Sequence, residues 1–125
     1  MSQIRSVFVP TQNIQQYSNY YLVQLLAKER VRCIMEGDQF NDISGALVER
    51  YLEIPPKLTR QEDIQKYCAS EGKMILQSFK VFEKDPVYTE AIKNLKPYAG
   101  NKFEIANVTA AGLVVLIEVP DAAVA

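Results

Sequence analysis

Residues Ser6–Ala27 read SVFVPTQNIQQYSNYYLVQLLA and contain no side chain with a formal charge. A membrane-spanning helix needs about 20 predominantly apolar residues, and the glutamines and asparagines of this stretch exclude that interpretation. Pro10 divides the stretch, because proline cannot donate a hydrogen bond within a central strand. The stretch therefore predicts a strand followed by an uncharged helix that either lies under the rest of the fold or contacts a partner.

The strand before Pro10 is predicted over Gln3–Val9, with Ile4 and Phe8 on one face and Arg5, Val7 and Val9 on the other. It is uncharged apart from one arginine. A strand of this kind needs neighbours to be stable in water, and the other uncharged run of the chain lies near its C-terminal end.

Two further strands are predicted there, over Lys102–Thr109 and Leu113–Val119, joined as a hairpin by a short loop at Ala110-Ala111-Gly112. The sequence LVVLI is apolar on both faces, which favours a central, covered strand. A hairpin alone is marginal in water, so the N-terminal strand is expected to complete a small three-stranded sheet packed on helices, an α+β fold.

The segment between the strands predicts three to four helices. The first is expected from Gln12 to Glu36, capped by Thr11 or Asn13 and ended by Gly37. Residues 30–36 also alternate as a strand would, and this alternative stays open. The second helix is expected to run from Ile43 to about Glu53, before Pro55-Pro56, with one apolar face formed by Ile43, Leu47, Tyr51 and Ile54.

The third helix carries the strongest local signal, a capping box at Thr59–Glu62. It is expected to reach about Lys84 and to bury a stripe formed by Ile64, Tyr67, Cys68, Ile75, Phe79 and Phe82. Asp85-Pro86 is typical of a helix start, so a fourth, short helix carrying Tyr88, Ile92 and Leu95 is predicted to end near Pro97.

The length of 125 residues predicts a single globular domain, 1–125, with residues 1–2 and 121–125 as flexible ends. The formal net charge of −1 gives no global basic field. Only Arg5, Glu118 and Asp121 carry charge outside residues 28–104. The N-terminus has no signal-peptide pattern, so a cytoplasmic protein is expected, including one made inside an infected host cell.

The chain has no histidine, which removes the commonest general base and metal ligand. We therefore expect no enzyme activity, no cofactor and no metal site. Glu36, Asp38 and Asp42 cluster in one predicted loop, but their spacing is not that of a calcium loop. Cys33 and Cys68 lack zinc-site spacing; free thiols are favoured, and a disulfide between them stays open.

The predicted first helix offers a candidate interface. Tyr17 and Tyr21 fall on its apolar face, whereas Tyr20 is rotated away from it. Exposed tyrosine among amides is typical of adaptable contact surfaces. The candidate interface residues are Gln16, Asn19, Tyr20 and Gln24.

The leading hypothesis is a small non-enzymatic protein–protein interaction module. It would be an inhibitor or adaptor, of the kind that phages and mobile elements encode, or a subunit of a larger or homo-oligomeric assembly that needs no membrane. The alternative is a nucleic-acid-associated regulator that uses a local basic patch, Lys28, Arg30 and Arg32. A small enzyme without a recognisable motif is the third hypothesis.

Overall fold

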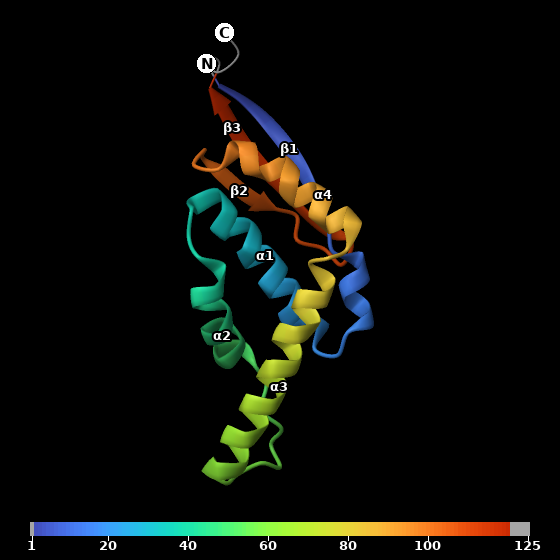
Figure 1. Cartoon of the computed structure of the whole chain (residues 1–125), viewed down its shortest axis with the longest axis vertical. Coiled ribbons are helices and arrows are strands. Elements are labelled where there is room, and N and C mark those ends of the chain that lie inside the picture. Colours follow the sequence, from blue (N-terminus) through green and yellow to red (C-terminus); the bar gives the residue numbers. More distant parts are fainter. Residues whose placement is uncertain (1, 121–125) are drawn as a thin grey trace.

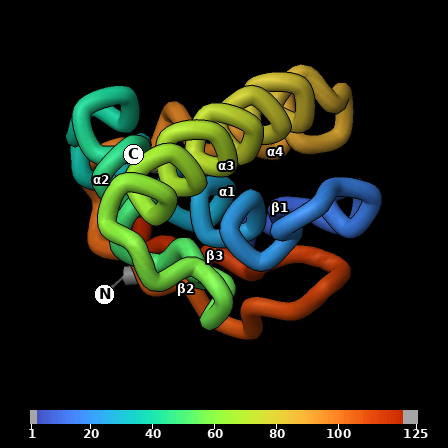
Figure 2. Tube along the Cα trace, turned by 90° about the horizontal axis from the view of Figure 1, so that it is seen from below, coloured from blue at the N-terminus to red at the C-terminus, as the bar shows by residue number. Residues whose placement is uncertain are grey.

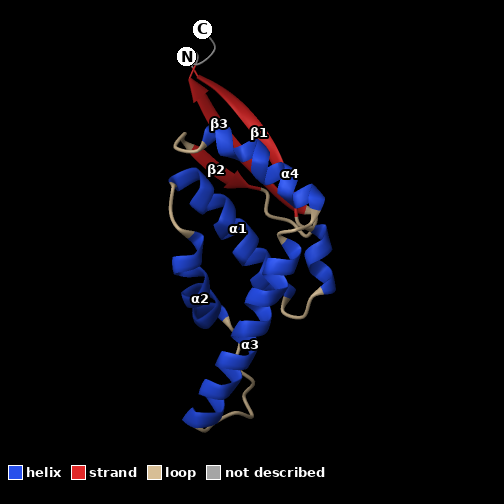
Figure 3. Ribbon diagram, in the orientation of Figure 1, coloured by secondary structure: helices blue, strands red, loops and turns tan. Residues whose placement is uncertain are grey.

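The computed structural model describes the backbone of residues 2–120 and the side chains of residues 3–120. The flexible ends predicted at Met1 and at 121–125 lie outside these residues, whereas Ser2 belongs to a strand. Along the chain, the elements are β1 (Ser2–Pro10), a 3-10 helix (Gln12–Gln16), α1 (Tyr20–Glu36), α2 (Phe40–Tyr51), α3 (Gln61–Phe82), α4 (Pro86–Leu95), a second 3-10 helix (Lys96–Tyr98), β2 (Phe103–Ala106) and β3 (Gly112–Pro120) (Figures 1 and 3).

The three strands form an antiparallel sheet in the order β1-β3-β2, which confirms the predicted α+β fold. The pairing of β1 with β3 has no break, from Ser2 opposite Pro120 to Pro10 opposite Gly112. The central position predicted for the last strand is confirmed. The preceding strand is shorter than predicted, because the chain leaves the sheet at Asn107, which has a positive φ of 50°.

The helices cover only one face of the sheet. Figure 2 shows the helices gathered on one side of the three strands. Val9, Leu113, Val115 and Ile117 point to that side and are buried. The residues between them on β3 are only half-buried, so the prediction that this strand is covered on both faces is wrong.

The predicted helix from Gln12 to Glu36 is in fact two helices. Asn19 adopts a left-handed conformation (φ 57°), a state that asparagine tolerates better than most residues, and α1 begins only after it. Residues 30–36 are helical, which settles the alternative left open above. Gly37 ends α1 as predicted, with φ 80° and its amide donating to the carbonyl of Cys33 at 2.8 Å.

Two local predictions in α2 and α3 are also wrong. The buried face of α2 is formed by Phe40, Ser44 and Val48, whereas Tyr51 and Ile54, predicted on the apolar face, are exposed. The helix also begins three residues earlier than predicted. The capping box is absent, since α3 starts after Arg60 with no side-chain cap, and the helix ends at Phe82.

The centre of the helical layer is an aromatic cluster. The ring of Phe79 on α3 lies 5.2 Å from that of Phe40, 6.5 Å from Phe82 and 6.4 Å from Tyr88, measured between centroids. Burial raises the pKa of the Tyr88 hydroxyl well above its usual value, because the phenolate would be desolvated. The cluster thus joins α2, α3 and α4.

Asp85 caps α4 as predicted, and this cap can be tested by mutation. Its Oδ1 accepts from the amide of Val87 at 3.0 Å, and Pro86 occupies the first turn. Asp85→Ala is expected to lower the free energy of unfolding by about 1 kcal/mol, measured by urea denaturation. Asp85→Asn, which keeps a capping oxygen, should lose much less, and equal losses in the two variants would contradict the assigned role.

Candidate binding surface

The predicted interface residues of the first helix do not form one exposed face. Gln16 lies in the 3-10 helix, separate from α1. Asn19 donates to Glu71 of α3 at 3.1 Å, and Gln24 donates to the carbonyl of Thr109 at 2.7 Å. These amides therefore fasten α3 and the β2–β3 loop to α1.

Tyr20 is exposed as predicted, with 52% of its surface accessible. Tyr21, predicted to be in the core, is exposed as well, and its ring stacks edge-on against Tyr20 at 6.3 Å. Leu22, Val23 and Leu26 of the same helix are buried in the core. A role of this surface in binding stays a prediction.

The basic patch has much of its charge balanced within the chain. The Nε atom of Arg32 lies 2.6 Å from a carboxylate oxygen of Glu29, and its Nη1 atom contacts Glu36 and Asp38. The hydrogen bond to Glu29 is the main cause that raises the pKa of Arg32, so this guanidinium remains charged. Glu36 and Asp38 are thus part of an ion-pair network.

The other two cations of the patch are less neutralised. Arg30 lies over the ring of Phe40, 5.7 Å from its centroid, and Lys28 is half-buried on α1. The network around Arg32 leaves little concentrated positive charge for a phosphate backbone, and nucleic-acid binding stays a prediction.

Cys33 and Cys68 are free thiols, and burial raises the pKa of the Cys33 thiol.

A second exposed apolar surface lies on the face of the sheet opposite the helices. Ile4 is 65% exposed and Phe8 is 51% exposed, both on β1. Val114 and Leu116 lie beside them on β3 and are half-buried. We call the surface formed by Ile4, Phe8, Val114 and Leu116 the open face.

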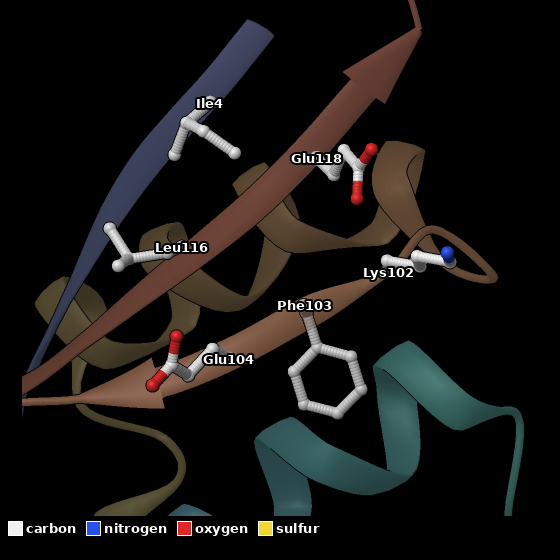
Figure 4. A pocket seen from close by; sticks show the side chains of 6 residues that line it. All are labelled: Ile4, Lys102, Phe103, Glu104, Leu116 and Glu118. Carbon is white, nitrogen blue, oxygen red and sulfur yellow. The ribbon is translucent and has the colours of Figure 1, made fainter. Parts of the chain in front are cut away.

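The open face carries a hollow of about 410 Å³ next to Ile4 and Leu116 (Figure 4). Lys102, Glu104 and Glu118 stand around its apolar floor. An apolar floor with a charged rim is the usual anatomy of a protein-binding surface.

The outer edge of β1 carries backbone groups that point away from the sheet. The amide of Thr11 donates to the carbonyl of Ala111 at 3.0 Å and continues the β1–β3 ladder, in which hydrogen-bonded pairs alternate. The odd-numbered residues of β1 therefore bond β3. Consequently, the backbone amides and carbonyls of Ile4, Ser6 and Phe8 face outward.

α4 packs against β1, and its N-terminal end lies beside the C-terminal end of the strand (Figure 1). A shallow groove of about 700 Å³ lies between the two elements. Phe8 and Pro10 line it on the strand, and Val87, Glu90 and Asn94 line it on the helix. The outer edge of β1, the open face and this groove adjoin one another at Phe8.

Sequence reasoning placed Ile4 and Phe8 on one face of their strand but did not identify them as a candidate site. The sequence feature that could have identified this site was the presence of apolar residues on both faces of β1. Two apolar faces on a strand whose partners cover only one of them leave the other exposed.

Every helix in the described part of the chain, residues 2–120, is either too short or too polar to span a membrane. The same residues bring no group of three or more Cys, Asp or Glu side chains together in a way that could hold a metal ion. Comparisons with protein-family models, with curated proteins and with solved structures found no match to this chain.

Proposed function

We propose that the protein is a non-catalytic protein–protein interaction module that binds an extended strand of a partner protein along the outer edge of β1. The observation that carries the proposal is the outward-facing backbone of Ile4, Ser6 and Phe8 on a long edge strand with no break in its ladder. Such an edge is a template for strand addition.

The side chains of the edge support the same proposal. Folded proteins commonly protect an edge strand with lysine, an inward-pointing charge or a bulge. Of these devices, β1 carries only a charge on the helical face of the sheet, Arg5, which is exposed; it has no lysine and pairs with β3 without a bulge. Ile4 and Phe8 would lose their solvent-exposed apolar surface against an added strand, at about 25 cal/mol per Å² of apolar surface buried.

Ser6→Pro tests the proposal directly. The amide of residue 6 faces away from β3, so proline removes no hydrogen bond of the β1–β3 ladder, but it removes an outward donor and places a ring at the edge. The fold should persist, which circular dichroism checks. A partner is first captured with the tagged protein, then identified and purified. Ser6→Pro should raise the dissociation constant for this partner at least about tenfold, as expected when hydrogen bonds along the edge are lost.

Tyr20→Arg is the matched control, because Tyr20 is exposed, as Ser6 is, but lies on α1. It should leave the affinity for that partner unchanged. A partner that is lost with Tyr20→Arg and retained with Ser6→Pro would instead assign binding to the tyrosine surface of α1 and overturn the proposal for β1.

A further inference from the structure

We infer that the strand bound by β1 is the β1 strand of a second copy of this chain, so that two protomers form a continuous six-stranded antiparallel sheet. This inference rests on the proposed function, because it uses the same outer edge. It names the occupant from the register, the side chains and the charges of β1 and α4.

The register of β1 is self-complementary. The strand spans Ser2–Pro10, and its central residue, Ser6, is one of those with outward-facing backbone groups. A two-fold axis through Ser6 places Ile4 opposite the partner's Phe8, and Ser6 opposite its own copy. All residues of both strands then overlap, and the outward groups form about six hydrogen bonds.

Other two-fold registers are poorer. An axis at Ile4 or at Phe8 leaves part of each strand unpaired. An axis at Arg5 would place two arginines directly opposite each other, which like-charge repulsion disfavours. It would also leave Val9 and Pro10 of each strand unpaired. The Ser6 axis alone combines full overlap with the outward backbone groups.

The side chains of the open face match in the Ser6 register. Ile4, 65% exposed, would lie against the exposed ring of the partner's Phe8, and the symmetric pair forms on the other side of the axis. Aromatic–aliphatic pairs directly across two strands stabilise a sheet. The two most exposed apolar side chains of β1 thus cover one another.

The charges match as well. Arg5 would stand opposite the partner's Val7, on the face of the sheet where the partner's α4 packs. Glu90 of α4 lines the groove beside Phe8 and Pro10, next to the position that Arg5 would enter. Within residues 2–120, neither Arg5 nor Glu90 takes part in an ion pair. The two-fold axis forms the complementary pair twice.

The first test is the oligomeric state of the pure protein, measured by light scattering and analytical ultracentrifugation. The wild-type protein should be a dimer. Arg5→Glu and Glu90→Arg should each raise the dimer dissociation constant at least about tenfold, because each leaves like charges facing one another. The double variant Arg5→Glu/Glu90→Arg should return to within about threefold of wild type, since the pair is reversed.

The second test reads the register by disulfide cross-linking in a Cys68→Ser background, with Cys33 left buried. Ser6→Cys should cross-link two protomers on oxidation, because directly opposite residues of a hydrogen-bonded pair lie about 5.5 Å apart between Cα atoms, within disulfide range. Ile4→Cys is the control and should not cross-link, because its own copy lies several residues away across the axis.

A monomeric wild-type protein, or a dimer that survives Ser6→Pro and fails to cross-link at Ser6→Cys, overturns this inference. The proposed function fails separately. If the pure protein is monomeric but a different partner binds in a Ser6→Pro-sensitive manner, the edge of β1 is the binding site and only the identity of the occupant is wrong. If neither self-association nor partner capture responds to Ser6→Pro, both are wrong.

Discussion

Phe79→Ala is expected to lower the free energy of unfolding by about 3–5 kcal/mol, the largest effect of any single substitution considered for this protein. The ring of Phe79 is 2% exposed and contacts rings from α2, from its own helix and from α4. Truncation removes this buried surface and leaves a cavity that three separate elements would have to move to fill. Urea denaturation followed by circular dichroism measures the loss.

Val81→Ala is the matched control for Phe79→Ala. Val81 lies on the same helix, two residues away, and is 55% exposed. Its truncation should change the unfolding free energy by less than about 0.5 kcal/mol, as is usual for surface positions. A loss below about 1 kcal/mol for Phe79→Ala would show that the aromatic cluster does not hold the helical layer together.

Gly112→Ala is expected to destabilise the protein by about 1–3 kcal/mol or more, because the new methyl group has no room. A Cβ atom at this position would lie 2.4 Å from the carbonyl oxygen of Val9 and 2.7 Å from the ring of Phe8. The backbone oxygen cannot move without disturbing the β1–β3 pairing, so the cost falls on the sheet. Urea denaturation midpoints give the size of the loss.

Gly45→Ala is expected to change the free energy of unfolding in the opposite direction in the same assay. Gly45 lies within α2, and a Cβ atom there would meet no atom within 4 Å. Alanine should therefore stabilise the protein by up to about 1 kcal/mol through helix propensity. If Gly112→Ala were neutral or stabilising, the close approach of β1 and β3 at this turn would not exist as described.

The sheet was predictable because its strands stand out from a charged middle segment. The pairing of β1 with β3 followed from two uncharged runs at opposite ends of the chain, both of which need a covered face. Helix boundaries were less predictable. Helical periodicity continues across Asn19, and nothing in it signals the left-handed residue that breaks the helix. The buried face of α2 was also predicted incorrectly, because apolar spacing alone did not indicate that Phe40, Ser44 and Val48 face the core.

The candidate site was predictable only in part. The exposure of Tyr20 follows from its angle on a helical wheel, which the late start of α1 did not change. The hydrogen bonds of Asn19 and Gln24 could not be predicted, because their partners, Glu71 and Thr109, are distant in the sequence. The exposure of Ile4 and Phe8 also required the fold, since alternation defines two faces of a strand without saying which one the helices cover.

The strand order has a consequence for how the chain folds. β3 lies between β1 and β2 but is the last of the three along the chain. Within residues 2–120, β1 and β2 pair only with β3, so this sheet cannot begin to form before Gly112–Pro120 has been synthesised. The helices can form earlier from local contacts, whereas closure of the loop between β1 and β3 spans most of the chain and is slow. During synthesis, β1, whose single charged residue is Arg5, therefore stays without a neighbouring strand, and in this interval it is most open to pairing with the same strand of another nascent chain.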